Sequence, residues 1–154
     1  MRKLLCALLS LVTVFSMAMT VFAVEIPAIE VPSREKAFAE TPPPIVNSGV
    51  TRAISLDFGG LDGNNYFYCC ECQVTQGKTK IIIDSCSWLP TYDIEIGLYS
   101  NTTSKKYRAT LSGGSVNNVT ITTDDVPSGF YWMYIHNMSD STISSGVLFY
   151  SITG

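Results

Sequence analysis

Short runs in which apolar and polar side chains alternate fill the chain from residue 51 onwards. Residues 92–99, YDIEIGLY, show this most clearly, because Ile94, Ile96 and Leu98 alternate with Asp93, Glu95 and Gly97. A period of two places alternate side chains on opposite faces of a β-strand. The pattern therefore predicts a strand with one face in a core and the other, which carries the carboxylates, in water.

Eight such runs occur, and the segments between them are rich in Gly, Asn, Asp, Ser and Pro, which favour turns. No segment has a sustained helical period. We expect strands near residues 51–57, 65–75, 79–86, 92–99, 105–112, 117–123, 129–137 and 146–153. About eight short strands at this spacing predict an all-β, antiparallel, jelly-roll-like β-sandwich over residues 50–154.

Residues 1–23 have the composition of a signal peptide. Arg2 and Lys3 precede a long apolar run that ends in Val21-Phe22-Ala23, which suits cleavage after Ala23. The run is also about long enough for an uncleaved membrane anchor, although four Ser and Thr residues dilute it. We expect cleavage, and hence a secreted, extracellular protein with no membrane insertion afterwards.

Residues 24–49 differ in texture from the rest, with five prolines and four glutamates. Proline lacks an amide donor and disfavours helix at the residue before it. We expect a Pro-rich linker or disordered tail; the alternative is a spacer that holds the globular part away from a surface.

The charge of the chain argues against several partners. Removal of the leader leaves a net charge of about −5, and no basic cluster exceeds the pair Lys105-Lys106. Such a surface repels nucleic acid and anionic membranes. We expect a monomer that binds no nucleic acid.

Four cysteines follow the leader: Cys69, Cys70, Cys72 and Cys86. An even number in an exported chain predicts two disulfides. Strict alternation puts Cys70 and Cys72 on one face and Cys69 on the other. A hairpin at residues 76–78 would bring Cys86 beside Cys69 or Cys70, and we favour Cys70–Cys86. Free thiols and a zinc site remain as alternatives.

Two short motifs resemble a known family. Trp88-Leu89-Pro90 precedes Asp93-Ile94-Glu95-Ile96-Gly97-Leu98-Tyr99, and Val126-Pro127-Ser128-Gly129-Phe130-Tyr131 follows later. Together they resemble the bacterial pre-peptidase C-terminal domain over about residues 55–153. That resemblance implies a small extracellular jelly-roll-like sandwich that accompanies secreted enzymes as a non-catalytic accessory.

Catalytic constellations are weak in this sequence. His136 is the only histidine, and the carboxylates fall at expected turns and solvent faces. The acidic and amide side chains of residues 57–65 are an oxygen-rich loop of the kind that binds calcium, although turn chemistry also explains them. We expect no enzymatic activity, no cofactor and no metal.

The run GFYWMYIHN, residues 129–137, carries large side chains on both faces of one strand. Its odd-numbered members are Tyr131, Met133 and Ile135. Its even-numbered members are Phe130, Trp132, Tyr134 and His136. If the odd-numbered residues face the core, the even-numbered ones form an outward aromatic stripe, which Tyr99 and Tyr150 would extend; the alternative is burial of that stripe by a neighbouring segment.

An exposed aromatic row binds sugar rings by stacking and also suits a protein partner. We therefore expect a small secreted binding module for glycan or a cell-surface partner, with Phe130, Trp132, Tyr134 and His136 at the binding site. The alternatives are a structural or interaction protein of the cell envelope and an extracellular hydrolase whose site the sequence does not reveal.

Overall fold

A computed structural model describes residues 23–32 and 53–154. These residues form ten strands: β1 (Val24–Pro27), β2 (Ile29–Pro32), β3 (Ile54–Asp57), β4 (Tyr66–Val74), β5 (Lys80–Leu89), β6 (Ile94–Ser100), β7 (Lys105–Leu111), β8 (Ser115–Thr122), β9 (Gly129–Asn137) and β10 (Ser145–Thr153). None of the described residues is helical, so none of them belongs to a helix that could cross a membrane.

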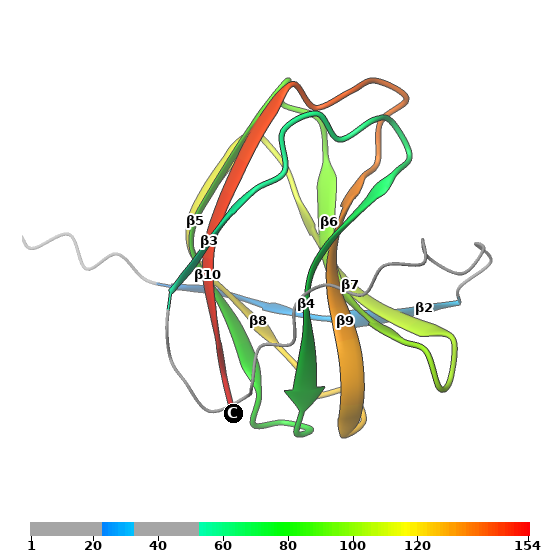
Figure 1. Ribbon diagram of the computed structural model, residues 1–154. Coiled ribbons are helices and arrows are strands. Elements are labelled where there is room, and N and C mark those ends of the chain that lie inside the picture. The colour runs from blue at the N-terminus through cyan, green and yellow to red at the C-terminus, as the bar shows by residue number, and fades with distance from the viewer. Residues whose placement is uncertain (1–22, 33–52) are drawn as a thin grey trace, which may run out of the picture.

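The strands form two five-stranded sheets packed against each other (Figure 1). The first sheet has the order β1-β8-β5-β10-β3, and the second has the order β2-β7-β6-β9-β4. Strands β3 to β10 correspond to the eight predicted runs, and their interleaved order is that of a jelly roll. The predicted all-β antiparallel sandwich is thus confirmed.

The expected linker is wrong at its N-terminal end, because residues 24–32 belong to the sandwich. β1 pairs in parallel with β8, and β2 pairs antiparallel with β7. The chain passes from the first sheet to the second at the buried Ala28. Pro27 and Pro32 end their strands, and both strands are sheet edges, where a missing amide donor is tolerated. Residues 33–49 of the expected linker, and residues 1–22 of the leader, lie outside the described residues.

Apolar side chains from both sheets meet in one core. The inward-facing residues of β6, which are Ile94, Ile96 and Leu98, belong to it, as predicted. The prediction that the other face of β6 is wet is wrong, because every residue of this strand is buried. β6 is the central strand of the second sheet, and side chains of β7 and β9 cover its outer face.

A β-bulge explains where the cysteines lie. The register between β4 and β9 shifts between Tyr68 and Cys70, which leaves Cys69 without a residue opposite it. As a result Cys69 and Cys70 are both in the core cluster, together with Cys72 and Cys86. The strict alternation predicted for this strand is therefore wrong at one position, and all four thiols share the interior.

The expected disulfides are absent from this structure: all four cysteines are free and buried. In this core they act as small apolar side chains. Burial raises the pKa of every thiol, that of Cys86 to about 12. For Cys69 the neighbouring sulfurs of Cys70, Cys86 and Cys72 raise the pKa further.

This burial predicts a loss of stability in alkaline solution. An unfolded chain ionises its thiols above about pH 8.5, whereas the folded chain keeps them protonated. The stability is thus complete below that pH and falls as the pH rises toward the raised pKa values, by up to about 1.4 kcal/mol per pH unit for each thiol. Urea unfolding from about pH 7 to about pH 10 measures this slope. Cys86→Ala removes one thiol, so an unchanged slope in that variant would contradict the explanation.

Candidate functional site

The two faces of β9 are separated as the sequence predicts. Tyr131, Met133 and Ile135 are buried in the core cluster. The even-numbered residues of β9 lie opposite residues of β4 that are outside the core. Trp132 lies opposite Glu71, and His136 lies opposite Tyr66. Directly opposite residues share a face of the sheet. The predicted stripe therefore lies on the outer face of the second sheet.

This stripe is not the flat, exposed platform that the sequence suggested. Phe130 is 65% exposed, Trp132 and His136 are partly buried, and Tyr134 has no exposed surface. Tyr134 is buried because it packs against Gly97 of β6, where a Cβ atom would lie 2.4 Å from the tyrosine Cζ. The absence of a side chain at Gly97 thus leaves room for the Tyr134 ring. Because that ring is buried, the middle of the stripe offers no exposed aromatic surface.

Tyr66 of β4 and Lys106 of β7 complete the cover over Tyr134. The Tyr66 ring meets the Tyr134 ring edge-on, with 5.4 Å between centroids. The Lys106 ammonium donates a hydrogen bond of 2.7 Å to the Tyr66 hydroxyl and lies 4.3 Å from the centre of the Tyr66 ring. A cation over an aromatic face is favourable, and Lys106 is itself buried.

His136 belongs to a cluster around one buried carboxylate. Glu95, which is only 2% exposed, accepts a hydrogen bond from Arg108 and lies 3.0 Å from His136 Nδ1 through its other oxygen. The imidazole also stacks on Tyr66, with 4.1 Å between centroids and an 8° interplanar angle. These contacts pair the buried carboxylate with cationic or donor groups, as a buried charge requires. They give His136 a structural function in this face.

Trp132 lies on the outer surface of the second sheet and not between the layers. Its ring meets Tyr68 edge-on at a centroid distance of 5.7 Å. Tyr99 of β6 lies opposite Trp132, on the same outer face, as the predicted extension of the stripe requires. Tyr99 is nevertheless buried and adds no exposed surface to the stripe. Tyr150, by contrast, is a core residue.

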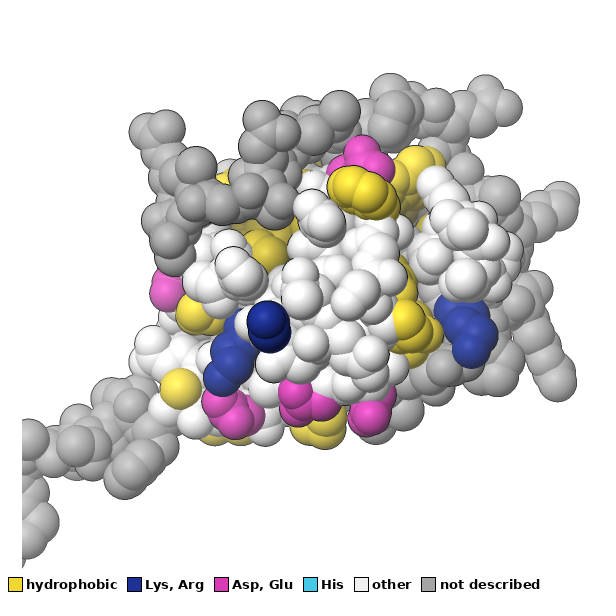
Figure 2. Space-filling model, turned by 90° about the horizontal axis from the view of Figure 1, so that it is seen from below, with side chains coloured by type: hydrophobic (Ala, Val, Ile, Leu, Met, Phe, Trp, Pro, Cys, Tyr) yellow, Lys and Arg dark blue, Asp and Glu magenta, His cyan; other side chains and the backbone are white. Residues whose placement is uncertain are grey.

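The open end of the stripe adjoins a cavity. Phe130 borders a hollow of about 360 Å³ where β6 turns into β7 and β9 begins. Its lining includes the polar residues Ser100, Thr102, Thr103, Lys105 and Ser128, together with the buried Tyr107 and Tyr131. Figure 2 views the molecule from this end, where most of the described surface is uncharged polar side chains and backbone, with scattered hydrophobic and charged side chains. An exposed ring beside several hydroxyl groups suits a ligand with one apolar face and many hydroxyls.

The sequence did not predict the polar side of this cavity. Its hydroxyl groups come from the β6–β7 turn, SNTTSK, and from the loop before β9. Both segments look like ordinary turn sequences, and only the tertiary fold brings them to Phe130. One feature of the sequence could have indicated this cavity: the β6–β7 turn is longer than a tight hairpin needs and is rich in hydroxyl side chains.

The loop of residues 57–65 forms hydrogen bonds with the loop before β10. Asn64 donates a hydrogen bond of 2.6 Å to Asp140, and Thr142 donates one of 2.9 Å to Asp62. Among the residues that the structure describes, no group of three His, Cys, Asp or Glu side chains has metal-binding geometry. The polar residues of this loop therefore hold two neighbouring loops together.

No family model matches this chain, and no curated protein matches it either.

The contact between Gly97 and Tyr134 gives a stability prediction. Gly97→Ala places a Cβ 2.4 Å from Cζ of Tyr134, closer than van der Waals contact allows, so we expect it to lower the free energy of unfolding by about 2–3 kcal/mol. Gly129→Ala is the matched control, because its Cβ would meet its nearest atom at an ordinary 3.5 Å. Urea unfolding measures both. If Gly97→Ala is as stable as the control, this packing does not close the stripe.

Proposed function

We propose that this protein is a small secreted, non-catalytic module that binds carbohydrate at the Phe130 end of β9. The observation that carries the proposal is the exposed Phe130 ring beside the hydroxyl-lined cavity. A sugar ring stacks its C–H face on an aromatic side chain, and its hydroxyls pair with protein hydroxyl and ammonium groups. The cavity volume is within the range that small ligands occupy.

Tyr134 and His136, further along β9, stabilise the strand that carries this site. Tyr134 and His136 are held by Gly97, Tyr66 and Glu95, so the outer face is rigid up to Trp132. A rigid face loses little conformational entropy when it binds a ligand. In this proposal Phe130 contacts the sugar directly, Trp132 borders it, and Tyr134 and His136 position the strand.

Loss of the Phe130 ring tests the proposed site. Phe130→Ala should weaken retention on the best ligand of a polysaccharide array by about tenfold, which corresponds to about 1.4 kcal/mol. Unfolding stability should change by less than about 0.5 kcal/mol, because the ring is exposed. Isothermal titration calorimetry with the isolated ligand gives the affinity.

Tyr92→Ala is the control, since Tyr92 is also an exposed aromatic residue but precedes β6 at the other end of the sandwich. Equal affinity of Phe130→Ala and the unmodified protein would overturn the site. Failure to bind any glycan would favour the alternative of a structural protein of the envelope.

Secretion gives a separate prediction. Cleavage after Ala23 would make Val24 the first residue of the mature chain, and Val24 is also the first residue of β1. Intact-mass analysis of protein collected from the culture medium should therefore give a chain of residues 24–154 with four free thiols. A protein that keeps residues 1–23 and sediments with membranes would show that the leader is an anchor.

A further inference from the structure

A second large aromatic side chain is exposed on the opposite sheet. Phe149 lies in the middle of β10 and is 42% exposed, whereas its neighbours Leu148 and Tyr150 are completely buried. The alternation shows that Phe149 stands on the outer face of the first sheet. Nothing in the core requires a phenylalanine at this position.

The strand register surrounds Phe149 with small polar residues. Phe149 lies opposite Ser55 of β3 and Ser85 of β5, and Ser85 lies opposite Asn117 of β8. Residues directly opposite one another have side chains on the same face, about 5 Å apart. One aromatic ring therefore lies in a row of hydroxyl and amide groups that crosses four strands, a width of about 14 Å.

The next row repeats this chemistry. Val147 lies opposite Asp57 of β3 and Ser87 of β5, and Ser87 lies opposite Ser115 of β8. Apart from the partly buried Val147, the members of this row are exposed. The two rows form a small polar field with an apolar strip along β10.

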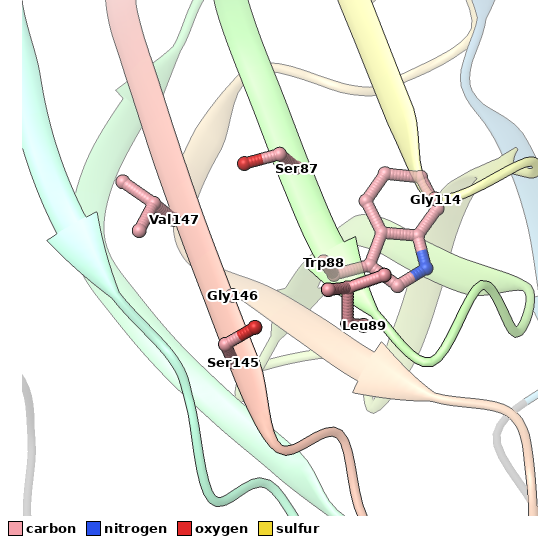
Figure 3. Close-up of a pocket in the computed structure, with 7 residues that line it drawn as sticks. All are labelled: Ser87, Trp88, Leu89, Gly114, Ser145, Gly146 and Val147. Carbon is pink, nitrogen blue, oxygen red and sulfur yellow. The ribbon is translucent and has the colours of Figure 1, made fainter.

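A hollow of about 300 Å³ adjoins the second row, between β5 and β10 (Figure 3). Ser87, Leu89, Ser145 and Val147 supply side chains to its lining. The hydroxyl of Ser87 on β5 and that of Ser145 on β10 point toward the gap between their strands (Figure 3). The hollow thus combines aliphatic walls with two hydroxyl groups.

The charge of this face restricts the ligand. Asp57 is the only ionisable side chain in the two rows, and it also accepts a hydrogen bond from the amide of Gly59. Asp84, the unpaired residue of β5 at the register shift beside Phe149, is a second exposed carboxylate next to the rows. A face with hydroxyl groups, one amide and two carboxylates repels polyanions and offers hydrogen-bonding groups to a polyol. An uncharged carbohydrate complements it better than an acidic one.

We propose that the outer face of the first sheet is a second carbohydrate site, at which a neutral polysaccharide chain lies across β3, β10, β5 and β8. Phe149 stacks against one sugar ring, and the hollow beside Val147 takes the next. The site depends on its own residues and stands whether or not Phe130 binds sugar. If both sites bind, they lie on opposite sheets, and one monomer cross-links two polysaccharide chains.

Affinity electrophoresis tests this site with defined probes. Native gels containing mixed-linkage β-glucan, xylan or the acidic polymer polygalacturonate should show retardation by at least one neutral polymer and none by the acidic one. Phe149→Ala should weaken the retardation by about tenfold in apparent affinity, the equivalent of about 1.4 kcal/mol. Phe149→Tyr keeps the ring and should restore it, and Met138→Ala is the control for loss of an exposed apolar side chain elsewhere.

Each outcome separates the two sites. Turbidity of a soluble β-glucan solution should rise with the unmodified protein, which cross-links the chains. It should not rise with Phe149→Ala or Phe130→Ala, because each variant keeps only one site and cannot cross-link. If Phe149→Ala retains full retardation, or if no neutral polymer retards the unmodified protein, the second site is overturned. If Phe130→Ala retains full retardation while Phe149→Ala loses it, and the unmodified protein raises no turbidity, the Phe130 site fails and the Phe149 site stands alone.

Discussion

The register between β6 and β9 determines the arrangement of the whole second sheet. It places Ile96 opposite Ile135 on the inner face and Gly97 opposite Tyr134 on the outer face. Because glycine has no side chain, the tyrosine ring settles on the backbone of β6, and Tyr66 and Lys106 pack over it. A shift by one residue would exchange the faces and expose the core side chains.

Most of the fold could be predicted because, in an antiparallel sandwich, inward apolar and outward polar residues alternate along each strand with a period of two. Strands β3 to β10 follow that pattern closely enough to be recognised. β1 and β2 do not, since four residues are too few to establish a period and each ends in proline. Proline is compatible with an edge strand, so the composition that predicted a linker also permits these two strands.

For the candidate site, the sequence predicted only which residues of β9 face the core and which face outward. The sequence separates the even-numbered residues of β9 from the core, but exposure depends on what lies opposite each of them. Tyr134 faces a glycine and is buried, whereas Phe130 lies beyond the paired part of β6 and is exposed. Cys69 shows the same limitation, because a one-residue bulge turns it into the core and no local residue pattern marks the bulge.

The two outer faces of the sandwich have opposite characters as a result. On the second sheet, large aromatic and charged side chains pair with one another, and the buried Glu95 contacts the partly buried Arg108 and His136. On the first sheet, the side chains opposite Phe149 are short and cannot reach over its ring. A polar group that already has protein partners offers little to a ligand, because binding must first break those contacts. The two proposed binding sites accordingly lie where the neighbours are small, at Phe149 and at the hydroxyl-lined end beside Phe130.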